Sequence, residues 1–407
     1  MIGRRPIKEI LVSSSCIGIL ILFLLWERLV LEHRVRKVRL RICVTGTRGK
    51  STVTRLIASA LKEAGYSVLA KTSGSKAAVV FPDGREEDVK RRGRVTILEG
   101  KRILKTAAEL GVDVLVSELM SIGPECLSTE SARIFHPHFL VVTNVRLDHR
   151  EEVGRTKQEI ARSLAAAIPS RCTVFIPDEE FYPVFQEAAG RKSSDIVRVP
   201  MQSATSGGAL KSPKKAGEFT ENICLALALT SYLGIQEEVA LQGMAKAPSD
   251  FGSLRIWTME TGLPSLILYV ASAFAANDPE SARKAVDKLK EIVPFEGKRV
   301  TGLLNLRGDR GDRTLQWLNA FQNGYFPEIQ KIVFLGDHVH AVNRRWRRTG
   351  VSPLEVSALS ERTPRKIMER VSVPDGKEAI FIGMGNMGGV GKDLVAFWER
   401  VGDAYGA

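Results

Sequence analysis

The stretch RICVTGTRGKSTVTRLIASALKEAGYSVLAKT, residues 41–72, determines how the first half of the chain folds. Its first five residues predict a strand, because apolar side chains recur on one face. Apolar residues then recur at helical spacing over residues 53–64, and Gly65 is a residue type that commonly ends a helix. The stretch therefore predicts a strand, a glycine-containing loop and a helix in succession.

The loop between this strand and this helix is suited to bind phosphate. A helix N-terminus offers free N–H groups and the positive end of the helix dipole. Gly46 and Gly49 let the backbone approach phosphate oxygens, Lys50 is expected to reach the terminal phosphates, and Ser51 or Thr52 to bind Mg²⁺. The spacing departs from the common G-x-x-x-x-G-K-[ST] pattern. An ordinary strand-to-helix turn with an exposed lysine is the alternative.

The composition describes a basic globular protein. The chain has 407 residues, enough for two domains after a membrane anchor, with 44% hydrophobic and 26% charged residues. Its net charge of +13 suits an acidic partner such as nucleic acid, anionic lipid or a polyanionic substrate. The basic clusters around residues 90–94 and 344–348 lack interleaved stacking aromatics apart from Trp346, so we expect no nucleic-acid partner. The five cysteines have no C-x-x-C spacing, which argues against a zinc site.

The N-terminus predicts a membrane anchor. Residues 10–26 contain no charge, and 17 residues is the short end of a spanning helix. More basic residues follow this run than precede it, so the positive-inside rule places the rest of the chain in the cytoplasm. A cleavable signal peptide is the alternative, but Trp26-Glu27-Arg28 follows the run in place of a small-residue cleavage site. We expect a single-pass cell-membrane protein with cytoplasmic catalytic domains.

The remainder of the chain alternates strand-like and helical segments, among them a strand over residues 173–177 and helices over 279–292 and 390–401. This alternation predicts α/β domains with mostly parallel sheets. The pattern resets near residues 248–257, and a second, smaller set of strands and helices follows. We predict a membrane anchor with a basic juxtamembrane segment over residues 1–39, a P-loop ATPase domain over 40–255 and a smaller Rossmann-like α/β domain over 256–407.

Further candidate residues follow predicted strands. Ligands gather at the carboxyl ends of strands in open α/β sheets. Glu118 ends the strand DVLVSE, and His149 follows the strand FLVVTNV. Together with Lys50 they predict a site for phosphate and metal, although His149 could also act through a water. An exposed glutamate and a surface histidine are the alternatives for each residue alone.

Two stretches of the second domain are weaker candidates. FIGMGNMGGVGKD matches G-x-G-x-x-G, but the remaining sequence leaves no room for the further strand that NAD binding needs. Two interpretations of this stretch remain: a helix start that binds an anion, and a tight strand-to-helix turn. NLRGDRGDRT follows a strand, and its mixed charge fits either a substrate site or a salt-bridged loop. The substrate candidates from the two stretches are Arg307, Asp309, Arg310 and Asn386.

Taken together, these residues resemble the ATP-dependent Mur ligase superfamily. Its loop signature, Gly-Thr-x-Gly-Lys-Ser/Thr, is present as residues 46–51 and explains the departure from the commoner spacing. Within the superfamily the chain is most similar to the ligase subunit of capsular poly-γ-glutamate synthase, over roughly residues 40–400. The stretches that carry the similarity are TGTRGKSTVTRLIASALKEAGY, VSELM, NVRLDH, the helix around Asn222, PSDFGSLRI, AFAANDPES, NLRGDRGDRT and GMGN.

The resemblance implies a reaction and the residues for it. ATP phosphorylates a substrate carboxylate, and an incoming amine attacks the acyl phosphate to form an amide. ATP and Mg²⁺ are the implied cofactors. The residues implied to bind ATP are Gly46, Thr47, Arg48, Gly49, Lys50, Ser51, Thr52, Asn222, Arg255 and Asp278. Those implied in catalysis are Lys50, Glu118, His149 and Arg255, and those implied to support the metal are Ser51, Glu118 and His149.

Three of these roles depend on distant parts of the chain. The resemblance implies that Asn222 lies near the adenine, that Arg255 approaches the γ-phosphate, and that Asp278 reaches the nucleotide from the second domain. Two departures from the superfamily accompany them. Only about 40 residues precede the loop, too few for the UDP-sugar domain of cell-wall ligases. Leu164 and Ala165 lie where many members place a carbamylated lysine.

The resulting hypothesis is an ATP-dependent γ-glutamyl ligase that adds glutamate to a poly-γ-glutamate chain at the membrane. Its expected partners are the amino acid, the acidic polymer, and other membrane subunits of a synthase or export complex. A ligase of folylpolyglutamate type acting on a small acceptor is one alternative. A membrane-tethered P-loop ATPase or kinase that drives an assembly is another, and a nonenzymatic nucleotide-binding scaffold is a third.

Overall fold

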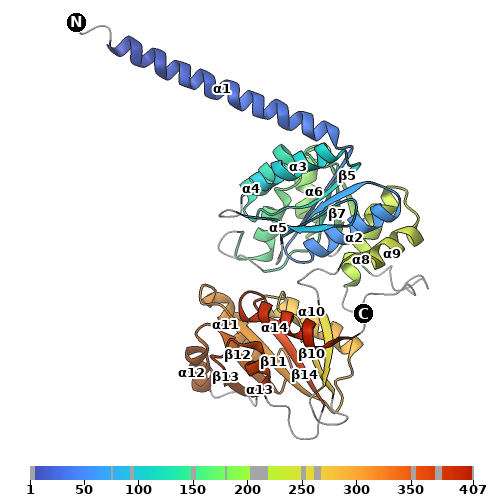
Figure 1. The fold of residues 1–407 in the computed structure, drawn as a ribbon, viewed down its shortest axis with the longest axis vertical. Coiled ribbons are helices and arrows are strands. Elements are labelled where there is room, and N and C mark those ends of the chain that lie inside the picture. The colour runs from blue at the N-terminus through green and yellow to red at the C-terminus, as the bar shows by residue number, and fades with distance from the viewer. Residues whose placement is uncertain are drawn as a thin grey trace. The chain divides into compact units, whose positions relative to one another are not determined.

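The chain divides into two units, each with its own central sheet (Figure 1). The first unit comprises Met1–Ser73, Ala77–Pro200 and Leu225–Gly243, and the second comprises Gly74–Lys76, Met201–Cys224 and Met244–Ala407. The computed structural model describes residues 5–74, 77–91, 96–147, 153–178, 181–201, 219–248, 254–260, 267–349, 354–371 and 378–405.

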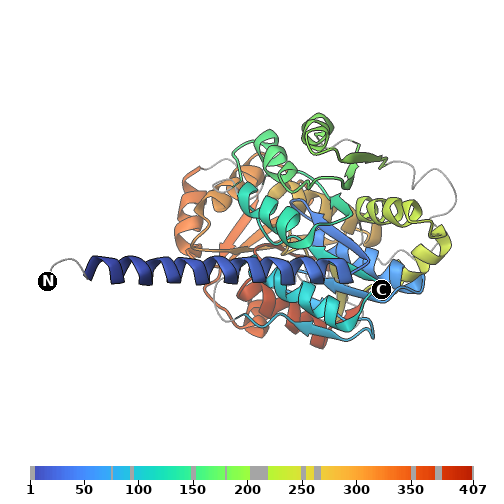
Figure 2. The same cartoon turned by 90° about the horizontal axis from the view of Figure 1, so that it is seen from above.

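The first unit begins with helix α1 (Arg5–Lys37), one unbroken helix in both views (Figures 1 and 2). Within Glu9–Lys37 an 18-residue window has a mean hydropathy of 2.2, and none of that window is buried. Among the residues that the structure describes, this helix alone is long and apolar enough to cross a membrane. Its last turns pack on the unit through Leu31 and Val35.

The sheet of the first unit has eight strands in the order β4-β3-β2-β5-β1-β6-β7-β8. Strands β2, β5, β1, β6, β7 and β8 are parallel, while β3 and β4 form an antiparallel edge. The strands are β1 (Leu40–Thr45), β2 (Val68–Lys71), β3 (Ala78–Val80), β4 (Glu86–Asp88), β5 (Val114–Glu118), β6 (Phe139–Val142), β7 (Thr173–Pro177) and β8 (Asp195–Val199).

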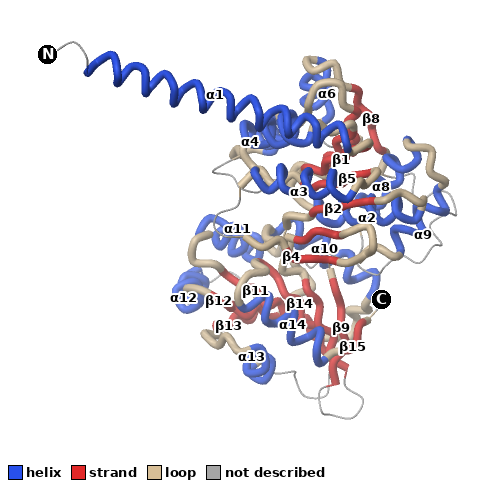
Figure 3. The backbone as a smooth tube through the Cα atoms, turned by 45° about the horizontal axis from the view of Figure 1, so that its top comes forward, coloured by secondary structure: helices blue, strands red, loops and turns tan. Residues whose placement is uncertain are grey.

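Helices cover this sheet because its central strands are apolar on both faces. Figure 3 shows the strands with labelled helices around them. Helix starts follow local signals, as where Thr156 and Glu159 form a capping box. The helices are α2 (Lys50–Glu63), α3 (Leu98–Leu110), α4 (Pro124–Thr129), the π-helix η1 (Glu130–Phe135), α5 (Lys157–Ala165), α6 (Tyr182–Gly190), α8 (Thr220–Tyr232) and α9 (Glu237–Ala245). The residues of α8 up to Cys224 and those of α9 from Met244 belong to the second unit.

The second unit has a seven-stranded sheet in the order β13-β12-β11-β14-β10-β9-β15. The first five are parallel, and β9 and β15 are antiparallel additions at one edge. The strands are β9 (Arg255–Glu260), β10 (Ile267–Ser272), β11 (Arg299–Leu306), β12 (Lys331–Gly336), β13 (Glu355–Ala358), β14 (Ala379–Gly385) and β15 (Asp403–Ala404). The helices are α10 (Pro279–Ile292), α11 (Gly311–Gln322), α12 (Val339–Thr349), α13 (Pro364–Arg370) and α14 (Val390–Val401).

The predicted α/β class with mostly parallel sheets is confirmed in both units. The predicted boundary between residues 255 and 256 stays a prediction. All five cysteines are free, and Cys43, Cys172 and Cys224 are buried. Burial raises the pKa of the Cys172 thiol to about 12, so this thiol is protonated at neutral pH.

Candidate active site around the phosphate-binding loop

The loop from Gly46 to Gly49 leaves β1 and enters α2 through backbone conformations that favour glycine. Gly46 has a φ of 126°, and a Cβ there would lie 2.2 Å from Thr143 Oγ1. Gly49, the residue before α2, is left-handed with a φ of 78°. The N-cap residue Gly49 makes no side-chain capping bond, and the backbone N–H groups and dipole at the N-terminus of α2 favour an anion.

Two residues at the end of β6 brace the loop from the neighbouring strand. Asn144 accepts a hydrogen bond from Arg48 N at 3.1 Å and donates one to Arg48 O at 3.0 Å. Thr143 Oγ1 donates to the same carbonyl at 2.6 Å. Thr47 also binds this segment, because its N–H donates to Asn144 O at 3.0 Å. The loop is therefore held in one shape through its own backbone.

The ammonium group of Lys50 lies against the loop. Its Nζ donates to Gly46 O at 2.8 Å and to Thr47 O at 3.3 Å. The positive charge is thus held beside the N-terminus of α2, where the helix dipole is also positive. The two effects favour a polyanion at the same place.

Ser51 and Glu118 converge beside the loop. The strands β1 and β5 are adjacent, and their register pairs Val44 with Glu118. Ser51 Oγ donates to Glu118 Oε2 at 2.7 Å, and the Ser73 N–H donates to the same oxygen at 2.7 Å. Both Ser51 and Glu118 are buried. A hydroxyl and a carboxylate are hard oxygen donors, so this pair fits Mg²⁺.

The third predicted metal-supporting residue, His149, lies outside the described residues. Within the described part of the chain, no group of three or more His, Cys, Asp and Glu residues is placed to hold a metal ion. The metal fit therefore rests on Ser51 and Glu118, together with the phosphate oxygens that Mg²⁺ commonly shares.

The predicted substrate residues lie at the carboxyl ends of two central strands of the second unit's sheet. Strands β11 and β14 are parallel neighbours, and their register pairs Asn305 with Gly385. Arg307 and Asp309 follow β11 and form an exposed ion pair with contacts of 2.8 and 2.6 Å. This hydrogen-bonded guanidinium lowers the pKa of Asp309. Arg310 precedes helix α11.

Asn386 follows β14, the second of these strands. Its N–H donates to Asn305 O at 3.0 Å, and the buried Asn305 amide donates to Asn386 O at 2.6 Å and to Gly388 O at 2.9 Å. Asn305 thereby fixes the glycine-rich turn before α14. This arrangement resembles the bracing of the first loop by Asn144, since an amide side chain in each unit holds a turn on an adjacent strand.

The other three predicted nucleotide contacts belong to the second unit and have local partners there. Arg255 begins β9 and contacts Glu399 at 3.1 Å. Asp278 is the N-cap of α10, with Oδ1 accepting from Ser281 N and Oδ2 from Ser281 Oγ, each at 2.8 Å. Asn222 is a buried residue of α8. Their nucleotide roles stay predictions.

Sequence reasoning missed several residues that shape these sites. Thr143, Asn144 and Asn305 were not predicted, and neither was the N–H of Ser73. Each polar side chain stands at or just beyond a strand's carboxyl end, which was the available signal. What marks them is hydrogen bonding to a loop far away in sequence, and a single sequence does not display it.

Two family models match this chain. The Mur ligase middle domain matches residues 44–244, and the poly-gamma-glutamate synthase CapB C-terminal domain matches residues 265–401. The chain is 30% identical over 390 residues to the PGA synthase CapB of Bacillus subtilis (strain 168), covering 95% of this chain and 96% of that protein. It is 29% identical over 393 residues to the capsule biosynthesis protein CapB of Bacillus anthracis, covering 96% and 82%.

Solved structures show the same fold at lower identity. A bifunctional folylpolyglutamate synthase/dihydrofolate synthase from Yersinia pestis, complexed with AMPPNP and Mn ion, is 16% identical with a TM-score of 0.65, covering 91% of each chain. MurF from Acinetobacter baumannii is 18% identical with a TM-score of 0.63, covering 91% of this chain and 80% of MurF.

Proposed function

The chain belongs to the poly-γ-glutamate synthase CapB family of Mur ligases and is an ATP-dependent amide ligase, and from that premise we propose that it adds glutamate to a poly-γ-glutamate chain at a membrane. The observation that carries this proposal is the braced loop with Lys50 and Glu118 beside it. Its similarity to the CapB proteins, one of them a PGA synthase, supports the substrate class.

The proposed reaction has two steps at one carboxylate. A carboxylate oxygen attacks the γ-phosphorus of ATP and ADP leaves, which gives an acyl phosphate. The amine of the next residue then attacks the carbonyl carbon and loses a proton, and phosphate leaves with the former carboxylate oxygen. The acyl phosphate hydrolyses in open water, so the site must exclude water while it exists.

The residues of the first unit supply phosphate binding and charge. The loop N–H groups and Lys50 bind the phosphates and stabilise negative charge that develops on the phosphoryl oxygens. Ser51 and Glu118 would hold Mg²⁺, and His149 is proposed as a further support. Bound there, Mg²⁺ would neutralise phosphate charge.

The residues of the second unit are proposed to bind the remaining reactants. Arg255 is proposed to approach the γ-phosphate, Asp278 the nucleotide, and Asn222 the adenine. Arg307 and Asp309 form an exposed pair of one positive and one negative side chain. These charges complement the carboxylate and ammonium groups of an amino acid, which supports a role in binding glutamate. Arg310 and Asn386 are proposed to contribute at the carboxyl ends of β11 and β14.

Helix α1 is proposed to anchor the protein in the cell membrane with both units in the cytoplasm. Its length and mean hydropathy support a single span, and the basic residues after the span support this orientation. A polymer made in the cytoplasm needs export, so we propose that other membrane subunits of a synthase and export complex bind this chain.

The proposal is tested by measuring phosphate release from ATP in the presence of Mg²⁺, with and without glutamate. The assay uses membranes that contain the protein. We expect release that depends on glutamate and a γ-linked product that resists ordinary proteases. Lys50→Ala should abolish both. Lys62→Ala is the matched control, because Lys62 is an exposed lysine at the other end of the same helix.

The same assay distinguishes the alternatives. A tethered ATPase would release phosphate regardless of glutamate, and a folylpolyglutamate-type ligase would need a small pterin acceptor. Polymer yield that is unchanged in Lys50→Ala would refute the assignment of the loop.

A further inference from the structure

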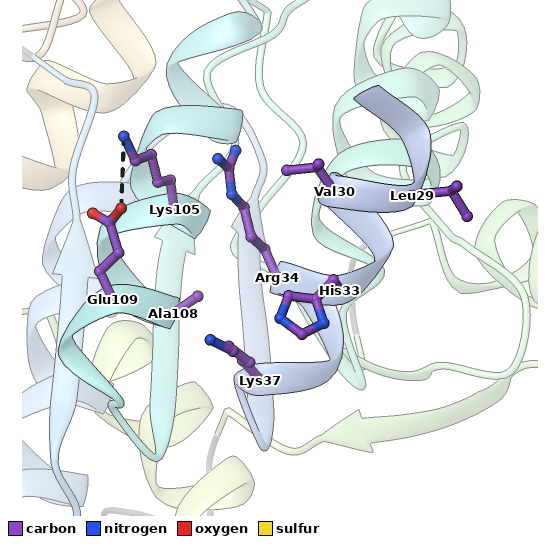
Figure 4. Close-up of a pocket in the computed structure, with 8 residues that line it drawn as sticks. All are labelled: Leu29, Val30, His33, Arg34, Lys37, Lys105, Ala108 and Glu109. Atoms are coloured by element: carbon purple, nitrogen blue, oxygen red, sulfur yellow. Dashed lines mark ion pairs between the residues drawn. The ribbon is translucent and has the colours of Figure 1, made fainter. Parts of the chain in front are cut away.

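An open pocket of about 420 Å³ lies between the last turns of α1 and helix α3 in the first unit (Figure 4). Its volume is in the range of small-ligand sites. The lining residues are Leu29, Val30, His33, Arg34, Lys37, Lys105, Ala108 and Glu109. None of them takes part in the phosphate site described above.

The pocket is a fixed part of the first unit, because three kinds of contact hold α1 in place. Arg41 Nη1 donates to Val35 O at 2.9 Å and to Val38 O at 2.6 Å, which caps the end of α1. Lys101 on α3 pairs with Glu27 on α1 at 2.7 Å. Apolar side chains of the last turns also pack on the unit's core.

The pocket carries excess positive charge. Glu109 is its single lining carboxylate, and it pairs with Lys105 at 3.6 Å. Arg34 and Lys37 make no ion pair with any carboxylate of the described residues. Figure 4 shows both side chains extending from α1 on the side that faces α3. The net positive charge of the lining residues therefore favours binding of an anion.

The apolar end of the pocket lies at the depth of the lipid headgroups. Leu29 follows Trp26, the end of the uncharged run, by three residues, or about 4.5 Å of helix. The headgroup layer extends roughly 5–8 Å beyond the hydrocarbon on each side. Arg34 and Lys37 follow Trp26 by eight and eleven residues, or about 12 and 16.5 Å of helix. Helical side chains lean toward the N-terminus, so the cationic ends of these two long side chains reach back toward the headgroup layer. The apolar residues Leu29 and Val30 lie on the membrane side of the cationic ones.

We propose that this pocket binds the headgroup of an anionic phospholipid. The lipid phosphate lies among Arg34, Lys37 and Lys105, and the start of the acyl chains lies against Leu29 and Val30. The inference rests on the membrane anchoring proposed above. It goes beyond general attraction of a basic segment to a membrane, because it assigns the lipid to one side of α1.

The test compares two double variants of the full-length protein in detergent, each offered equal amounts of phosphatidylglycerol and phosphatidylcholine. Native mass spectrometry measures the ratio of the two lipid adducts. We expect the wild type to prefer phosphatidylglycerol. Arg34→Gln/Lys37→Gln should reduce that preference roughly thirtyfold, from about 1 kcal/mol per cation near an anionic lipid. The matched control, Arg36→Gln/Arg39→Gln, removes the same charge outside the pocket and should stay within about twofold.

An equal loss of the phosphatidylglycerol preference in both double variants would overturn the proposal that this pocket binds the lipid. A wild type without that preference would overturn it as well. Displacement of phosphatidylglycerol by millimolar inorganic phosphate would instead identify a site for free phosphate and would also overturn the lipid assignment. The result is separable from the proposed ligase. Arg34→Gln/Lys37→Gln should keep glutamate-dependent phosphate release in detergent, and Lys50→Ala should keep the lipid preference.

Discussion

Gly46 shows how one residue without a side chain permits the phosphate loop. Gly46→Ala would place a Cβ 2.2 Å from Thr143 Oγ1 and 2.9 Å from Thr143 N, in a conformation with a φ of 126°. We expect the loop to shift and glutamate-dependent phosphate release to fall more than about a hundredfold, because misplaced contacts to phosphates cost transition-state binding.

Gly65→Ala is the matched control for this substitution. Gly65 also has a positive φ, of 90°, but a Cβ there would meet nothing within 4 Å. Gly65→Ala should lose about 1 kcal/mol of stability through backbone strain, and Gly46→Ala should lose more because the collision with Thr143 adds to the strain. The midpoint of thermal unfolding measures both losses. If Gly65→Ala lost activity as strongly as Gly46→Ala, strain and not the collision with Thr143 would explain the effect.

At the scale of single residues, the sequence predicted the side chains proposed to bind phosphate and metal but not the residues that hold the loop in place. Lys50, Ser51 and Glu118 were predicted as site residues, and that role stays a prediction; the structure adds a hydrogen bond from Ser51 to Glu118 at 2.7 Å. Asn144 was missed, because its partner Arg48 is 96 positions away along the chain. Nothing local distinguishes an asparagine that braces a distant loop from one in an ordinary turn.

Among the elements, the end of α1 depends on one buried side chain from β1. Arg41→Met would remove the hydrogen bonds to Val35 O and Val38 O, and the bond to Phe135 O at 2.9 Å. Leaving such carbonyls unpaired costs about 1–3 kcal/mol each where they are buried. We expect faster hydrogen–deuterium exchange in residues 30–41, with Arg39→Met, an exposed neighbour, unchanged.

In the second unit, Glu328 links α10 to the segment before β12. Burial opposes its ionisation, but hydrogen bonds from Arg283 and Lys290 outweigh this and lower the pKa of Glu328 to about 2. The carboxylate therefore stabilises the fold at neutral pH, and that contribution is lost as the pH falls from about 4.5 toward 2.

Glu328→Gln tests this linkage. We expect the variant to be less stable than the wild type by about 1–2 kcal/mol at pH 7, after allowance for solvent screening. The difference should shrink as the pH is lowered to about 3, because the carboxylate then gains a proton in the unfolded wild type while it stays ionised in the folded protein. Thermal unfolding of the full-length protein in detergent measures both values. A difference that grows at acid pH would contradict the account.

Elements with strong local signals were predicted well. The strand at residues 173–177 and the helices at 279–292 and 390–401 have the predicted bounds. The helix at 279–292 begins at Pro279, a proline at the first helical position, directly after the N-cap residue Asp278. The β3–β4 hairpin was missed. Its strands have three residues each, β4 is polar, and pairing with β2 creates them.

For the whole molecule, family membership and the sheets agree on an ATP-dependent ligase. Each unit places polar groups at the carboxyl ends of its parallel strands, where α/β sheets bind ligands. The sequence predicted this architecture because alternating strands and helices leave few topologies.

The central claim is that this enzyme activates a carboxylate through an acyl phosphate. The most direct measurement uses ATP, Mg²⁺ and glutamate labelled with ¹⁸O in its carboxylates, and follows the label into released phosphate. We expect one ¹⁸O per phosphate, since the leaving phosphate takes the carboxylate oxygen with it. Phosphate without label, released while ATP is consumed, would show attack by water and would contradict the account.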